Sequence, residues 1–98
     1  MVNQRSADIR LLIEAATSGR LEVRADLSKY PGYNGRMMGG INTLIDALVR
    51  PLRVTSGYLE RISRGEVPPP IAEAWPGDLD GLRASVNTCI AAINALLA

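Results

Sequence analysis

The side chains able to do chemistry are few in this sequence. Asp78 and Asp80 stand two residues apart, which suggests paired carboxylates for general acid and base catalysis. Cys89 is the single thiol. None of the 98 residues is a histidine that could activate this thiol or bind a metal ion. A helix start explains the carboxylates better, with Asp78 as its N-cap and Asp80 in its first turn. We therefore predict no enzymatic activity, no cofactor and no metal site.

The remaining candidates also favour structural roles. The glycines form no phosphate-binding pattern, and the net charge of +1 comes from scattered residues, so we expect neither nucleic acid nor a small molecule as a ligand. Cys89 is predicted to be a small buried hydrophobe, with a disulfide between two chains as the alternative. No apolar run approaches the ~20 residues that cross a bilayer, and we expect a cytoplasmic location, in a parent protein that is soluble or anchored in the inner membrane.

Helices must position these residues. From Met37 to Ile62, residues that are apolar or compatible with a buried helix face recur at alternating spacings of four and three, which is a heptad pattern. Ile45, Leu52 and Leu59 form a second row that widens the stripe. Pro51 marks a junction, at which a new helix begins or one helix kinks. The predicted bundle seam consists of Ile9, Leu12, Ala16, Met37, Ile41, Leu44, Leu48, Thr55, Tyr58, Ile62, Leu82, Val86, Cys89, Ile93 and Leu96.

The sequence repeats itself after about forty-five residues. Tyr30-Pro31-Gly32 pairs with Trp75-Pro76-Gly77, and Ile41-Asn42-Thr43 pairs with Val86-Asn87-Thr88. This predicts two units, residues 5–49 and 50–98, each with a helix, a connector and a second helix. The first helices end at Gly19 and Gly65, and the second helices start near Asn34 and Asp78.

The connectors are longer than an antiparallel helix hairpin needs. We therefore expect each connector to climb along its first helix, with Leu21 or Val67 in the groove, and to start the second helix in the same direction. A unit this small buries too little surface to fold alone. The predicted fold is all-α, with two chains forming a parallel four-helix bundle in each unit.

These stretches resemble tandem HAMP domains of the kind found in poly-HAMP chemoreceptors, which are methyl-accepting chemotaxis proteins, and in sensor kinases. GRLEVRADLSK from Gly19 and GDLDGLRASVNTCI from Gly77 carry much of the likeness, with GINTLIDALVRPL and ISRGEVPPPI. By position, the resemblance makes Gly19 and Gly65 the glycines after the first helix. Leu21 and Val67 match the first hydrophobic position of the connector in the first and second unit. Ile71 matches the second hydrophobic position in the second unit. In the first unit, the candidates for this second position are Val23, Ala25 and Leu27. Gly77-Asp78-Leu79 resembles the acidic motif of the second helix, which the first unit lacks, and Pro51 matches the proline that opens a first helix.

The resemblance implies a signal relay that passes a helix rotation or repacking from a sensor to an output domain. The partners would be a second copy of the chain and the adjoining sensor and output domains. Ala16, Thr55 and Cys89 are small and Tyr58 is bulky, so this mixed seam favours two packing arrangements of similar energy. Two alternatives stay open: a passive dimerisation spacer, and a monomeric antiparallel helical binding module.

Overall fold

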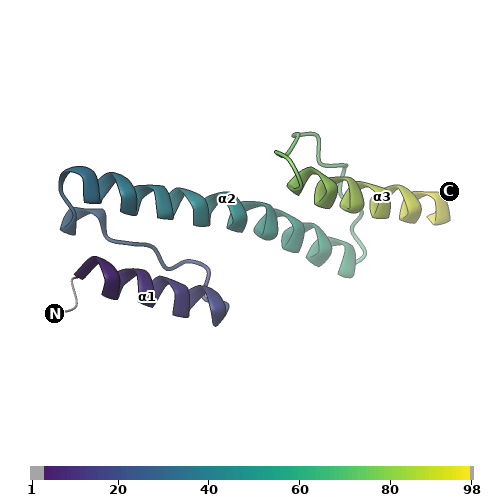
Figure 1. Ribbon diagram of the computed structural model, residues 1–98. Coiled ribbons are helices and arrows are strands. Elements are labelled where there is room, and N and C mark those ends of the chain that lie inside the picture. The colour runs from purple at the N-terminus through teal and green to yellow at the C-terminus, as the bar shows by residue number, and fades with distance from the viewer. Residues whose placement is uncertain (1–3, 98) are drawn as a thin grey trace. The chain divides into compact units, whose positions relative to one another are not determined.

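The computed structural model describes residues 4–97, and its elements are helical (Figure 1). They are α1 (Gln4–Thr17), the short 3-10 helix η1 (Leu27–Lys29), α2 (Gly32–Ser63) and α3 (Leu79–Leu97). The prediction of an all-α fold is confirmed. No helix among these residues is long and apolar enough to span a bilayer.

The chain divides into two compact units, Met1–Val49 (unit 1) and Arg50–Ala98 (unit 2). The boundary lies inside α2, next to Pro51, so each unit contains one part of this helix. Unit 1 combines α1 and η1 with the first part of α2, and unit 2 combines the second part with α3. Each unit therefore has a helix, a connector and a second helix.

Within unit 1 the two helices run in the same direction (Figure 1). The Arg5 guanidinium, at the start of α1, donates a 2.6 Å hydrogen bond to the Asn34 side chain, at the start of α2. Adjacent helix starts require a connector that returns along α1, as its length predicted. The predicted N-cap at Asn34 is wrong, because α2 begins two residues earlier, at Gly32. Gly32 has a φ of +65°, and glycine adopts this left-handed conformation without a steric penalty, which lets the chain turn into the helix there.

Unit 2 has the same parallel arrangement (Figure 1). The connector starts at the end of α2 and returns, so that Glu73 forms a 2.9 Å ion pair with Arg50 near the start of this unit's part of α2. Asp78 directly precedes α3, at the N-cap position.

The first helices of both units end with the same hydrogen-bond pattern. Arg20 N–H donates to the Ala15 carbonyl at 2.8 Å, and Gly19 N–H donates to the Ala16 carbonyl at 3.1 Å. The equivalent bonds at the end of α2 run from Glu66 N–H to Arg61 and from Gly65 N–H to Ile62. This pattern is the Schellman motif, and it requires the left-handed φ of +82° at Gly19 and +87° at Gly65.

Pro51 lies inside α2, which continues through it as one helix. Proline has no N–H to donate to the carbonyl four residues before it, so one helical hydrogen bond is missing here. The Thr55 hydroxyl donates to the Pro51 carbonyl at 2.8 Å, an additional local bond of the kind that bends helices. The sequence left two interpretations of Pro51, a new helix or a kink within one helix. The first is wrong, because α2 does not begin again at Pro51.

Candidate functional site

The core of unit 1 is small and lies between α1, the connector and α2. Leu12, Tyr30 and Met38 are buried and in contact, and Met38 is completely inaccessible to solvent. Partly buried apolar residues surround this cluster: Ile9, Ala25, Ile41 and Ile45. All three segments of the unit contribute, so the connector is part of the core.

Unit 2 has a larger core, and its first helix, connector and second helix all contribute to it, as in unit 1. Its buried residues are Ile71 and Trp75 from the connector and Val86 and Ile90 from α3. The partly buried residues packed against them are Val54, Tyr58 and Ile62 of α2, Val67 of the connector, and Leu79 and Leu82 of α3.

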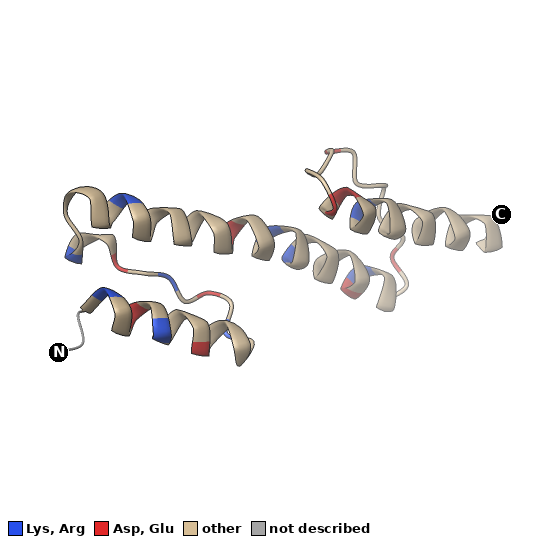
Figure 2. Cartoon of the chain, in the orientation of Figure 1, with Lys and Arg blue, Asp and Glu red and all other residues tan. Residues whose placement is uncertain are grey.

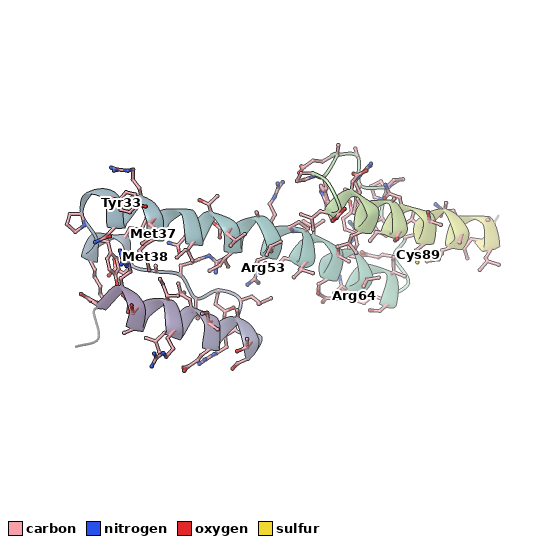
Figure 3. All side chains as sticks on the ribbon, viewed as in Figure 1. Tyr33, Met37, Met38, Arg53, Arg64 and Cys89 are labelled. Atoms are coloured by element: carbon pink, nitrogen blue, oxygen red, sulfur yellow. The ribbon has the colours of Figure 1, made fainter. Side chains whose placement is uncertain are left out.

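The predicted seam divides into two groups. Seven of its members lie in these clusters, namely Ile9, Leu12, Ile41, Tyr58, Ile62, Leu82 and Val86. Met37, Thr55 and Ile93 are half-buried, whereas Ala16, Leu44, Leu48, Cys89 and Leu96 are exposed. Cys89 is therefore not a buried residue within one chain (Figure 3).

Several core residues were not in the predicted seam. Met38, Ala15, Val49 and Ile90 are buried beside it, one position along the helix from Met37, Ala16, Leu48 and Cys89. A heptad pattern locates the middle of an apolar stripe, but the neighbouring helix of the same chain covers only one side of that stripe. The repeat could have indicated the aromatic pair, since Tyr30 and Trp75 occupy equivalent positions and are both buried.

An asparagine side chain joins the connector to the second helix in each unit. In unit 1 the amide of Asn42 accepts from Ala25 N–H at 2.8 Å and donates to the Ala25 carbonyl at 3.0 Å. In unit 2 the amide of Asn87 accepts from Ile71 N–H at 2.7 Å and donates to the Ile71 carbonyl at 3.1 Å. Because Asn42 and Asn87 are equivalent in the repeat, Ala25 occupies in unit 1 the place that Ile71 occupies in unit 2.

Asp80, two residues after Asp78 of the predicted acidic motif, is the acidic residue that binds the connector of unit 2. Its carboxylate accepts hydrogen bonds from Trp75 N–H at 3.1 Å and from Arg83 Nε at 2.6 Å. The hydrogen bond from Arg83 is the main cause that lowers the pKa of Asp80, and that from Trp75 is the second. The equivalent residue in unit 1 is Gly35, where a Cβ atom would collide with the Tyr30 carbonyl. Unit 1 therefore replaces the acid by close backbone packing.

Polar contacts also hold the connector of unit 1. The Tyr30 hydroxyl donates to the Asp8 carboxylate on α1. Burial, followed by this hydrogen bond, raises the pKa of Tyr30 to about 12. Arg24 Nε forms a 2.8 Å ion pair with Asp46 on α2, and its Nη1 donates to the carbonyls of Leu21 and Val23.

The charged side chains are the remaining candidates for a site. Among residues 4–97 there is no group of three potential metal ligands. Charged residues are spread over α1, the connectors and α2, whereas α3 carries none after Arg83 (Figure 2). A cavity of about 230 Å³ near the start of α1 is lined by Gln4, Arg5, Tyr30 and Asn34. Arg5 and Asn34 already bond to each other there, so what the arrangement can do is hold and adjust helix packing.

Parallel helices with a connector packed along them define a helix-packing module. Residues 29–95 match the model of the HAMP domain, and because this match covers more than half of the chain, the chain belongs to the HAMP family. HAMP domains relay signals in sensor proteins, are not catalytic and typically act as dimers. No curated protein and no solved structure matches the chain.

Proposed function

We propose that the chain is a tandem pair of HAMP units, residues 5–49 and 50–98, that relays a conformational signal as a parallel homodimer. The parent protein would be a bacterial chemoreceptor of the methyl-accepting type or a related sensor kinase. The module would lie in the cytoplasm between a sensor and an output domain. Helix rotation or repacking within the bundle would carry the signal.

The exposed leucines of α2 are the main support for the dimer. In unit 1, Leu44 and Leu48 lie one helical turn apart and are 59% and 51% exposed. In unit 2, Leu52 and Leu59 lie two turns apart and are 50% and 51% exposed. Rows of exposed leucine on one helix are typical of a face that is covered by a partner.

A second copy of the chain fits this face better than another partner. Leu44 and Leu48 follow Ile41 in the heptad pattern of α2, and Ile41 packs against the core of unit 1. One pattern thus includes a residue in contact within the chain and two that are left exposed. Helix α3, which carries no charged residue after Arg83, also needs more cover than α2 provides, and Leu96 is 85% exposed. Two chains would supply four such helices around one core.

The assignment of two units is supported by their shared construction. The family match begins at residue 29, so α1 and most of the first connector lie outside it. Unit 1 nevertheless has the same glycine-dependent helix end, the same asparagine contact and the same parallel helices as unit 2. We infer that the same kind of module occurs twice.

Measurement of the mass in solution tests the dimer. Sedimentation equilibrium of the 98-residue chain should give about twice its 10.5 kDa. A folded protein of 10.5 kDa at micromolar concentrations would refute the proposal and favour a monomeric module.

Cysteine crosslinking in the full-length parent tests the relay. Single cysteines would replace Leu44, Leu48, Thr55 and Tyr58 in turn, with Cys89 changed to serine. Crosslinking profiles that differ between opposing input signals are expected. Identical profiles would show a passive spacer instead.

A further inference from the structure

We propose that the connector and the second helix of each unit form one body, fastened by Asn42 or Asn87, and that the first helix moves against this body. The inference rests on the proposed relay for its functional meaning, but its structural part can be tested independently. Asn42 and Asn87 would be positioning residues, since they act through the connector.

The asparagine contacts are specific in geometry. Each side-chain amide pairs with both the N–H and the carbonyl of one connector residue, at distances between 2.7 and 3.1 Å. Two hydrogen bonds to one residue set the position of the connector along the helix, because a shift by one residue would break both. Both asparagines are half-buried, where unpaired polar groups are costly.

Further polar contacts join the connector to α3 in unit 2. Arg83 Nη1 donates to the Ile71 carbonyl at 3.2 Å, and Asp80 accepts from Trp75 N–H. The connector is thus bonded to α3 near its middle and at its end.

The part of α2 in unit 2 contacts the connector and α3 mainly through apolar side chains. Val54, Tyr58 and Ile62 pack against the cluster that contains Ile71 and Trp75. Apolar contacts have no preferred direction, so a helix held by them can rotate or slide more easily than one held by hydrogen bonds. Two ion pairs, Arg50 with Glu73 and Arg61 with Glu66, also join α2 to the connector, but both are largely exposed, and exposed pairs contribute little to stability.

Unit 1 has an additional contact that restrains its first helix. The Tyr30 hydroxyl bonds to Asp8 on α1, whereas the repeat places Trp75 and Val54 at the equivalent positions of unit 2. A polar contact in unit 1 is thus replaced by an apolar one in unit 2. We therefore expect α2 to move more freely in unit 2 than α1 moves in unit 1.

Amide hydrogen exchange of the 98-residue chain, measured by NMR, tests the single body. Ile71 N–H should exchange at a rate within a few-fold of the rates of Val86 and Ile90 in the middle of α3, after correction for sequence. In Asn87→Ala, Ile71 N–H should exchange at least about tenfold faster relative to those α3 amides. This ratio separates a positioning role from general destabilisation, which would speed all amides together.

Asn94→Ala is the matched control, because Asn94 is exposed and lies one heptad after Asn87 on α3. It should leave the Ile71 rate unchanged. Asn42→Ala repeats the test in unit 1, where the exchange rate of Ala25 N–H is measured. This variant replaces Asn87→Ala if Asn87→Ala does not fold.

Two results would overturn the inference: an unchanged Ile71 ratio in Asn87→Ala, or a wild-type Ile71 amide that exchanges far faster than the α3 amides. Sedimentation of the same samples reports the dimer separately. A monomer with a protected Ile71 amide would refute the proposed function while leaving the single body intact.

Discussion

Leu44→Ala gives the sharpest test of the dimer face. Leu44 is 59% exposed within one chain and lies in the predicted seam, so its main loss on substitution would come from contacts with the second copy. Alanine favours the helix as well as leucine does, and the fold of each chain should persist.

The size of the effect follows from the exposed fraction. Fully burying a leucine side chain stabilises by roughly 1.5–3 kcal/mol, and a little over half of this, about 1–2 kcal/mol, is left for the partner to bury. A symmetric dimer contains the contact twice, so the total is about 2–4 kcal/mol. The dimer dissociation constant should therefore rise by about 30- to 700-fold, since each 1.4 kcal/mol corresponds to about tenfold.

Sedimentation equilibrium over a range of concentrations measures this constant, and circular dichroism checks the helix content. Leu11→Ala is the matched control: Leu11 is 58% exposed on α1, but it lies outside the predicted seam. Its dissociation constant should remain within a few-fold of that of the wild type. Equal weakening by both substitutions, or by neither, would refute the assignment of this face.

Three further substitutions, one of them with a glycine control on α2, test the cores and the helix starts. Trp75→Ala should lower the free energy of unfolding by about 3–5 kcal/mol, because it empties the centre of the unit 2 core, and thermal denaturation that shows less than 1 kcal/mol would contradict this packing. Gly35→Ala should lower the stability, because the added Cβ would collide with the Tyr30 carbonyl. Gly57→Ala, where the added Cβ meets open space on α2, should stabilise the chain by about 0.5–1 kcal/mol. Urea midpoints that shift in the same direction for both variants would count against the close approach of Gly35 to Tyr30. The pKa of Asp80 is lowered in the folded chain, so its stabilising contribution is present above its unfolded pKa of about 4 and is lost as the pH falls through the folded value. Asp80→Asn should therefore be less stable than the wild type in urea at pH 7, and this difference should shrink as the pH falls below about 4. A difference that does not change with pH would disprove the role of the charge.

The sequence by itself predicted most of the helical structure. The heptad spacing predicted the helices, and Gly19 and Gly65 indicated where two of them end, because a left-handed residue after a helix is a local requirement of the backbone. The repeat and the length of the connectors predicted parallel helices, which the bond between Arg5 and Asn34 supports in unit 1. The exception is the start of α2, where the left-handed Gly32 begins the helix before Asn34.

The sequence predicted that Val67 packs between the helices, but it did not give the other contacts of the cores. The pattern included Leu48 and Cys89 in the seam, yet within the chain Val49 and Ile90 are the buried neighbours. Periodicity identifies an apolar stripe but not which side of it a particular helix covers, since that depends on crossing geometry.

The asparagine contacts show the same limit most clearly. Asn42 and Asn87 were visible as a repeated pair, but an exposed asparagine on a helix has the same sequence pattern as one that bonds to a connector. Only the tertiary structure decided between Val23, Ala25 and Leu27, by placing the Ala25 backbone against Asn42. Helix formation depends on residues close in sequence, whereas such a pairing depends on the path of an irregular segment in space, and the structure alone supplies that path.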